Sequence, residues 1–176
     1  MWAARNDCTA TVRVLMRYRR IDRASVDNDQ RNAISWASAG GHLETLLMLL
    51  KFNCPGVDVK DVWGWAPLAW AIQNNSPRTV ETLVSNRFVD VEQKDDSGRS
   101  ALSWAVEYGH LEVVRTLLQA DADPSSTDEA GMTPLATAEK FGRTEISEEI
   151  LYYIRKRSGR GLELAEGAGG NSTGEA

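Results

Sequence analysis

The side chains that most often carry out chemistry in proteins are few in this sequence and stand far apart. His42 and His110 are the only histidines, and Cys8 and Cys54 are the only cysteines. A zinc site needs such ligands at short spacing, and neither histidine has a cysteine or carboxylate partner at that spacing. The chain also lacks the G-x-S-x-G pattern of a nucleophilic serine. The sequence therefore predicts no metal site, no cofactor and no catalytic residue.

Two other motifs that resemble reactive sites have simpler interpretations. A dinucleotide-binding loop requires a strand before it and a helix after it. The glycine-rich stretch GAGG at 167–170 has neither in the prediction. The carboxylate pairs Asp95-Asp96 and Asp128-Glu129 resemble acid–base couples, but they fall in predicted turns, where solvated side chains are the simpler interpretation. We therefore expect a protein that is not an enzyme and takes no small-molecule substrate.

The apolar stretches, the first residues and the cysteines indicate the compartment in which the protein functions. The longest apolar stretch, LETLLMLLKF at 43–52, is about half as long as the roughly 20 residues that cross a membrane. The first residues, MWAARNDC, show no signal-peptide pattern, and two isolated cysteines fit a reducing compartment as packing residues. We expect an intracellular protein, cytoplasmic or nuclear, that does not bind a membrane.

Charge is spread unevenly along the chain. Residues 32–154 carry 9 basic and 18 acidic side chains. Nucleic acid is not expected as a partner there, because affinity for phosphate comes mainly from clustered Lys and Arg. Arg17, Arg19, Arg20 and Arg23 form a basic cluster in the first part of the chain. This cluster is either an interaction patch or a solvated helix end.

An internal repeat organises these side chains. Four phrases align at spacings of 34, 34 and 33 residues: NAISWASAGGHLETLLMLL from 32, APLAWAIQNNSPRTVETLV from 66, SALSWAVEYGHLEVVRTLL from 100 and TPLATAEKFGRTEISEEIL from 133. One column holds Trp36, Trp70 and Trp104, and a partial unit from Trp2 matches too, which indicates that the chain begins inside a repeat. Because a lone helix pair cannot cover its own apolar face, we expect the Trp column at the interfaces between units. An aromatic stripe that binds a ligand is the alternative.

Each unit is predicted to contain a helix, a break and a second helix. Gly41, Gly109 and Gly142 stand where the first helix should end, and Gly favours the left-handed conformation found there. Asn75 and Asp7 take that position in the other units. Asn also tolerates left-handed geometry.

A turn motif precedes the first helix of three units. Asp61-x-x-Gly64, Asp95-x-x-Gly98 and Asp128-x-x-Gly131 suit a tight turn with Gly at a positive φ. These stretches are predicted to form short β-hairpins.

The order of these signals resembles the ankyrin repeat: D-x-x-G, then [TSA]-[PA]-L-x-x-A, then G-H and a closing L-L, in units of about 33 residues. The resemblance covers about residues 1–154. It implies an all-α, ankyrin-type solenoid of helix-turn-helix repeats with short β-hairpin loops. His42 and His110 stand at the family's G-H position, where each is expected to cap the second helix and bond the neighbouring loop. The stretches LSWA at 102–105 and YGHLEVVRTLL at 108–118 are similar in particular to fungal ankyrin arrays, which are often attached to NACHT-type proteins.

One departure from the family's pattern concerns the loop that follows the second helix. The family's Gly is replaced there by Asn53, Arg87 and Asp121, and Arg87 in a left-handed conformation would be strained. The chain is predicted to divide into a partial repeat at 1–26, repeats at 27–60, 61–94 and 95–127, a C-terminal capping repeat at 128–157 and a disordered tail at 158–176.

The resemblance implies a non-catalytic module that binds a protein partner in its concave groove, through the hairpin tips and the exposed residues of the first helices. Trp63 and Trp65 stand out because neither belongs to the repeating framework, and exposed aromatics often dominate binding energy. Packing within the array is the alternative for both, and for Arg99 and Tyr108. The predicted contact residues are Trp63, Trp65, Gln73, Asn74, Asp96, Arg99, Glu107, Tyr108 and Met132. Two other functions stay open: the sensing or regulatory C-terminal part of a larger NACHT-type signalling protein, and a structural spacer.

Overall fold

The computed structural model describes residues 1–18 and 20–167, with side chains as far as residue 158. The elements are α1 (Trp2–Arg5), α2 (Thr9–Met16), α3 (Ala33–Ala39), α4 (Leu43–Lys51), α5 (Pro67–Gln73), α6 (Pro77–Val84), α7 (Ala101–Tyr108), α8 (Leu111–Gln119), α9 (Pro134–Lys140) and α10 (Thr144–Gly167). No strand occurs within these two described ranges. The predicted all-α fold class is confirmed.

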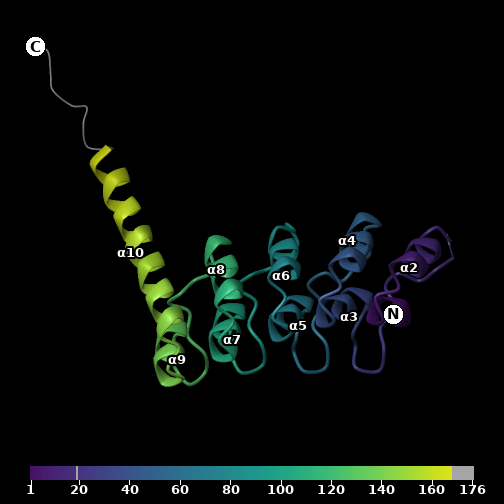
Figure 1. Ribbon diagram of the computed structural model, residues 1–176, viewed down its shortest axis with the longest axis horizontal. Coiled ribbons are helices and arrows are strands. Elements are labelled where there is room, and N and C mark those ends of the chain that lie inside the picture. The colour runs from purple at the N-terminus through teal and green to yellow at the C-terminus, as the bar shows by residue number, and fades with distance from the viewer. Residues whose placement is uncertain (19, 168–176) are drawn as a thin grey trace, which may run out of the picture.

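The helices stack as consecutive antiparallel pairs along one axis (Figure 1). The first helices of the pairs, α1, α3, α5, α7 and α9, pack on one another in sequence, and the second helices, α2, α4, α6, α8 and α10, form the other row. The pair α1 and α2 lies at one end of the stack, and the pair α9 and α10 lies at the other. Each unit therefore covers the apolar face of its neighbour, as a repeat array requires.

Side chains at the starts of the first helices satisfy backbone N–H groups that have no partner within the helix. The side chain of Asn32 accepts hydrogen bonds from the N–H groups two and three residues ahead, at the start of α3. Ser100 and Thr133 each accept one from the residue three positions ahead, at the starts of α7 and α9. Pro67 and Pro134 occupy the first turns of α5 and α9, where the missing N–H has no consequence.

The predicted helix breaks are confirmed by the backbone. Gly41, Gly109 and Gly142 have φ values of 65°, 78° and 64°. Asn75 and Asp7 adopt the same left-handed region, with φ values of 48° and 51°. The break turns the chain back after the first helix, so that the two helices of a unit pack side by side.

The core runs the length of the stack between the two rows of helices. Its large, fully buried side chains include Ile34, Leu46, Leu49, Ile72, Leu83, Leu102, Leu117, Leu118 and Ile150. One alanine in each of α3, α5, α7 and α9 is completely buried: Ala37, Ala71, Ala105 and Ala138. A small side chain at this position lets neighbouring helices approach closely.

We call residues 27–31, 61–65, 95–99 and 128–132 fingers 1 to 4. Each finger is closed by a backbone hydrogen bond from the N–H of its Asp to the carbonyl four residues on, at 3.0 Å from Asp61 to Trp65 and 3.0 Å from Asp95 to Arg99. Gly64 and Gly98 have φ values of 75° and 72°. Each finger is therefore a tight turn, and its short backbone pairing forms no strand in the described ranges.

The loop after α6 corrects the expectation for Arg87. Asn53 and Asp121 adopt positive φ values of 50° and 62°, whereas Arg87 does not. In the neighbouring units the next residue is small and buried, Cys54 at 8 % exposure and Ala122 at 1 %, but here it is Phe88, which is 65 % exposed. A phenyl ring is too large for that site, so the loop follows another path and Arg87 avoids the strained conformation.

The C-terminal helix extends further than expected. We expected a disordered tail from residue 158, but α10 continues to Gly167. The stretch LELAE at 162–166 consists of residues with high helix propensity, which outweighs the glycines before it. The rest of the expected tail, 168–176, lies outside the described residues.

Candidate partner-binding surface

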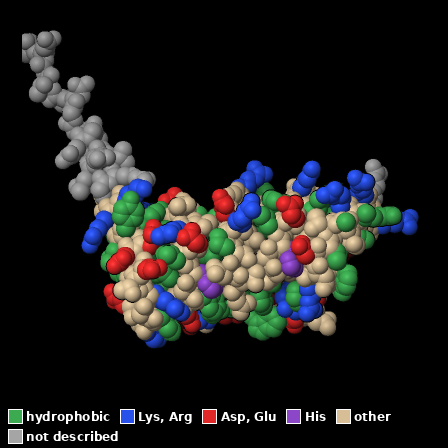
Figure 2. Space-filling model, in the orientation of Figure 1, with side chains coloured by type: hydrophobic (Ala, Val, Ile, Leu, Met, Phe, Trp, Pro, Cys, Tyr) green, Lys and Arg blue, Asp and Glu red, His purple; other side chains and the backbone are tan. Residues whose placement is uncertain are grey.

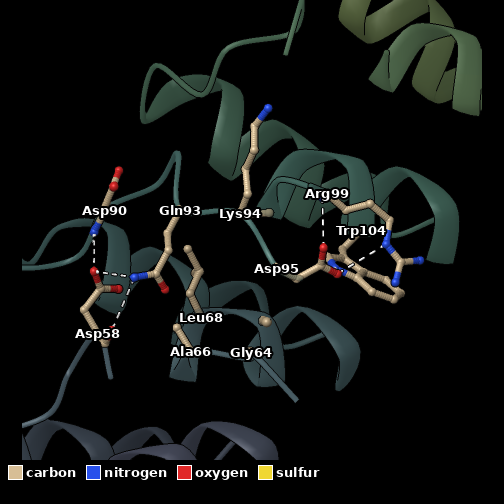
Figure 3. Close-up of a pocket in the computed structure, with 12 residues that line it drawn as sticks. Asp58, Gly64, Ala66, Leu68, Asp90, Gln93, Lys94, Asp95, Arg99 and Trp104 are labelled. Carbon is tan, nitrogen blue, oxygen red and sulfur yellow. Dashed lines mark hydrogen bonds and ion pairs between the residues drawn. The ribbon is translucent and has the colours of Figure 1, made fainter. Parts of the chain in front are cut away.

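The Asp that opens each of the first three fingers is bonded to the Trp nine positions later. In finger 3 the Oδ1 atom of Asp95 accepts the N–H groups of Ser97 and Arg99, each at 2.9 Å. Its Oδ2 atom accepts Nε1–H of Trp104 at 2.9 Å and the Nε–H of Arg99 at 3.3 Å (Figure 3). We call this arrangement the Asp–Trp clasp. Since the Asp95 side chain is only 7 % exposed, the expectation that it is solvated is wrong.

The same clasp joins the finger and the first helix of two other units. Trp36 Nε1–H donates to Asp27 at 3.0 Å, and Trp70 Nε1–H donates to Asp61 at 2.8 Å. Burial alone pushes the pKa of Asp27 upward, but hydrogen bonds from the Arg31 and Asp29 N–H groups and from Trp36, with the Arg31 charge, bring it below its ordinary value. The clasp of finger 1 therefore holds Asp27 as an ionised carboxylate.

Aromatic rings continue from unit to unit along this side of the array. Trp65 packs against Trp70 and Trp104, with ring centroids 5.0 Å apart in both pairs. Trp63 meets Trp70 edge to face at 6.2 Å, and Tyr108 stacks on Trp104 at 5.3 Å. We call Trp63, Trp70, Trp65, Trp104 and Tyr108 the aromatic row. Such pairs contribute about 0.5–1.5 kcal/mol each beyond the burial of their area.

The residue that closes each finger explains why Trp65 lies between two units. In fingers 1 and 3 this residue is an arginine whose guanidinium lies over the Trp of the clasp, Arg31 at 3.9 Å from the Trp36 centroid and Arg99 at 3.6 Å from the Trp104 centroid. Trp65 takes the position of the arginine in finger 2. Its ring therefore bridges the tryptophans of its own unit and the next.

The structure divides the predicted contact residues into packed and exposed groups. Trp65, Arg99, Glu107 and Tyr108 are half-buried around Trp104, and the guanidinium of Arg99 also pairs with Glu107 at 3.4 Å. Burial raises the pKa of Tyr108, although a hydrogen bond with Gln73 acts in the other direction.

The remaining predicted residues lie closer to solvent. Trp63 is 49 % exposed, Gln73, Asn74 and Asp96 are exposed, and Met132 is half-buried at the end of finger 4. The Asn74 amide donates to the hydroxyl of Ser76 at 2.9 Å. The structure thus brings four of the predicted residues into one cluster and leaves Trp63 and Asp96 on the finger tips. Their contact with a partner stays a prediction.

The histidines occupy the N-cap positions of the second helices, but neither side chain forms a cap hydrogen bond. Instead, Nε2 of His42 lies 3.1 Å from the carbonyl oxygen of Arg5 in the preceding unit. Arg143 takes the equivalent position in the last unit and donates to the carbonyl of Glu107 at 3.3 Å. Burial lowers the pKa of His110, so its ring is neutral at pH 7. These side chains tie neighbouring units together.

Comparison with known proteins agrees with this architecture. The family profile described as "Ankyrin repeats (3 copies)" matches residues 53–128 and 87–159. The chain belongs to the ankyrin repeat family. An ankyrin repeat-containing protein of the fission yeast Schizosaccharomyces pombe is 36 % identical to it over 63 residues, which are 35 % of this chain and 27 % of the relative. The chain thus spans about a quarter of the length of that curated relative.

Ankyrin repeats are in general protein-interaction modules, and the surface described above is built on their shared framework. Within the described residues, His, Cys, Asp and Glu form no group of three suited to a metal ion. No helix in the described part of the chain is both long and apolar enough to cross a membrane.

Two features of the ankyrin fingers were not predicted from the sequence. Gln30 has a φ of 64°, so finger 1 has the same turn as the others with Gln in place of Gly, and the D-x-x-G pattern missed it. Arg31 lies over Trp36 and also 5.4 Å from the ring centroid of Trp63 in the next finger. The sequence signal for this contact is the alignment column of the residues that close the fingers: Arg31, Trp65, Arg99 and Met132.

Proposed function

We propose that this ankyrin array binds a protein partner on its concave side, without chemistry of its own, and that the tip of finger 2 is the main anchor. Val62 and Trp63 at this tip are 53 % and 49 % exposed. Exposed large apolar side chains that adjoin each other mark interaction sites, and Trp is enriched among residues that dominate binding energy. The exposure of Trp63 beside an otherwise packed aromatic row is the observation that carries the proposal.

The packed members of the row suit a supporting role. Trp65 and Tyr108 already stack on framework tryptophans, so their removal is expected to disturb the array as well as the surface. Trp63 contacts Trp70 only through a ring edge, and Arg31 lies over it. Its side chain is therefore held in place while much of its surface faces solvent. A pre-positioned side chain loses little conformational freedom on binding.

The other functions considered from the sequence fit the same surface less directly. A regulatory part of a larger NACHT-type protein would use these fingers within one chain, and a structural spacer would leave Trp63 without a partner. We also propose that the repeats have the boundaries predicted from the sequence and that the chain is intracellular. The exposed tip of finger 2 favours the binding role over the spacer.

Site-specific crosslinking tests the proposal. A photoreactive phenylalanine analogue replaces Trp63 in one protein and Phe88, which is 65 % exposed in the loop after α6, in another. Both proteins are irradiated in extract from cells that express the chain, and crosslinked peptides are identified by mass spectrometry. We expect a defined partner peptide at position 63 that position 88 does not yield. Excess wild-type protein should displace this crosslink, and excess Trp63→Ala protein should not. Equal products from both positions would reject the finger 2 anchor.

A further inference from the structure

The fingers form one continuous edge, so a partner that contacts one tip also meets the next. The N–H of Val62 donates to the carbonyl of Asp29 at 3.1 Å, and the N–H of Glu129 donates to the carbonyl of Ser97 at 3.2 Å. Fingers 1 and 2, and fingers 3 and 4, are thus hydrogen-bonded to each other. Figure 2 shows hydrophobic side chains gathered on the lower edge of the molecule, over the loop that leads into α5.

The chemistry of the tips changes along this edge. The residue directly after the Asp of each finger is Asn28, Val62, Asp96 and Glu129 in turn, and all four are exposed. The edge is therefore neutral at finger 1, apolar at finger 2 and acidic at fingers 3 and 4. We call Val62, Trp63, Asp96 and Glu129 the tip edge.

The two acidic tips lie against the neighbouring fingers. A Cβ atom added to Gly64 would lie 2.6 Å from Oδ1 of Asp96, so this carboxylate sits beside the turn that carries Trp63. A Cβ atom added to Gly98 would lie 3.1 Å from Cγ of Glu129. An apolar anchor and two carboxylates therefore follow one another along the fingers at intervals of one repeat.

Neither carboxylate is neutralised by the surrounding chain. Within the described residues, Asp96 and Glu129 form no ion pair. The nearby guanidiniums are already engaged: Arg31 pairs with Asp27 and Asp29, and Arg99 pairs with Asp95 and Glu107. The tip edge thus presents two carboxylates without an ion-pair partner in the described ranges, next to an exposed indole.

We propose that the occupant of the tip edge is an extended protein segment with an apolar residue and, on one side of it, two basic residues at intervals of about three. The apolar residue packs on Val62 and Trp63, and the Lys or Arg side chains pair with Asp96 and Glu129. Packed helices lie about 8–10 Å apart, and an extended chain advances about 3.3 Å per residue, which gives this interval. The inference rests on the proposed function and adds the chemistry of the partner.

Peptide selection tests this chemistry without a known partner. A random 12-residue phage-displayed library is selected on the full chain, and the enriched peptides are labelled and titrated by fluorescence anisotropy. We expect enrichment of an apolar residue with Lys or Arg three and six positions away, on one side of it. Trp63→Ala should weaken binding about 30-fold or more, and each of Asp96→Asn and Glu129→Gln about 1.5–5-fold.

A charge-reversal pair provides the control. Asp96→Lys with Glu129→Lys should select peptides with acidic residues at the former basic positions, and the wild-type peptides should lose affinity. Glu81→Lys with Glu148→Lys makes the same change in charge at exposed positions on α6 and α10, and it should leave the selected sequences unchanged. Thermal melting of the wild-type chain and of every variant verifies that they are folded.

The outcomes separate the two proposals. If selected peptides need Trp63 but show no basic preference, the proposed function stands and the charge inference is overturned. If no selected peptide depends on Trp63, both are overturned. Sedimentation that shows a wild-type dimer lost in Trp63→Ala would assign the tip edge to a second copy of the chain and would also overturn the inference.

Discussion

Replacing Asp95 by asparagine isolates what the Asp–Trp clasp contributes to folding. The carboxylate accepts four hydrogen bonds, two at each oxygen, and its side chain is 7 % exposed. An amide keeps one acceptor oxygen for the turn N–H groups. Its NH₂ group then faces the N–H donors of Trp104 and Arg99, so two bonds are lost, and the buried indole donor of Trp104 has no acceptor.

The size of the effect follows from these bonds. A hydrogen bond to a charged group contributes about 1.5–3 kcal/mol, and a rotation of the new amide recovers part of the loss, so Asp95→Asn should lower the free energy of unfolding by about 2–4 kcal/mol. At this chain length the melting temperature should fall by roughly 5–15 °C. Urea titration followed by circular dichroism measures the change.

The adjacent residue provides a matched control. Asp96 is exposed and forms no ion pair within the described ranges, so Asp96→Asn should change the free energy of unfolding by less than about 0.5 kcal/mol. A double-mutant cycle with Trp104→Phe, which removes only the indole donor, should give a coupling energy of about 0.5–3 kcal/mol. If Asp95→Asn matches Asp96→Asn, or if the cycle shows no coupling, the clasp does not stabilise the array.

Three further changes test other parts of the fold. Gly109→Ala should destabilise the protein by about 1–2 kcal/mol in a denaturant titration, because φ is 78° there and the new methyl group would also lie 2.8 Å from Cζ of Arg143. Leu117→Ala, at a completely buried position, should cost about 2–5 kcal/mol, whereas a loss below 1 kcal/mol would contradict the described core. The pKa of His110 is lower in the folded state, so the unfolded chain binds the proton more readily and stability should fall as pH drops from 7 through about 6.5. His110→Gln should reduce this slope in melting curves recorded between pH 7 and 5.5.

Periodic features could be read from the sequence, whereas contacts between columns could not. The glycines of the helix breaks and the buried alanine column follow directly from the alignment, since each answers to a local backbone or packing requirement. The bond between Trp104 and Asp95 joins two columns that the alignment treats separately. Nothing in the spacing of nine residues shows that the finger folds back onto the helix.

The candidate surface was predicted in outline but not in detail. The sequence singled out Trp63 and Trp65 together, yet one is half exposed and the other is packed between two units. Their difference depends on the finger turn, which leaves Trp63 at the tip and places Trp65 at the closing position, beside Trp70 and Trp104. The path of the loop at Arg87 depends on the size of Phe88, a neighbour whose burial the pattern does not reveal.

The indoles of Trp70, Trp65 and Trp104 lie close enough for their electronic transitions to interact, with centroids 5.0 Å apart in each adjacent pair. The near-ultraviolet signal of such a group belongs to the assembled rings rather than to any single one. Separating two units would change this signal even if every helix stayed intact. The protein thus contains an intrinsic optical probe of order between its units.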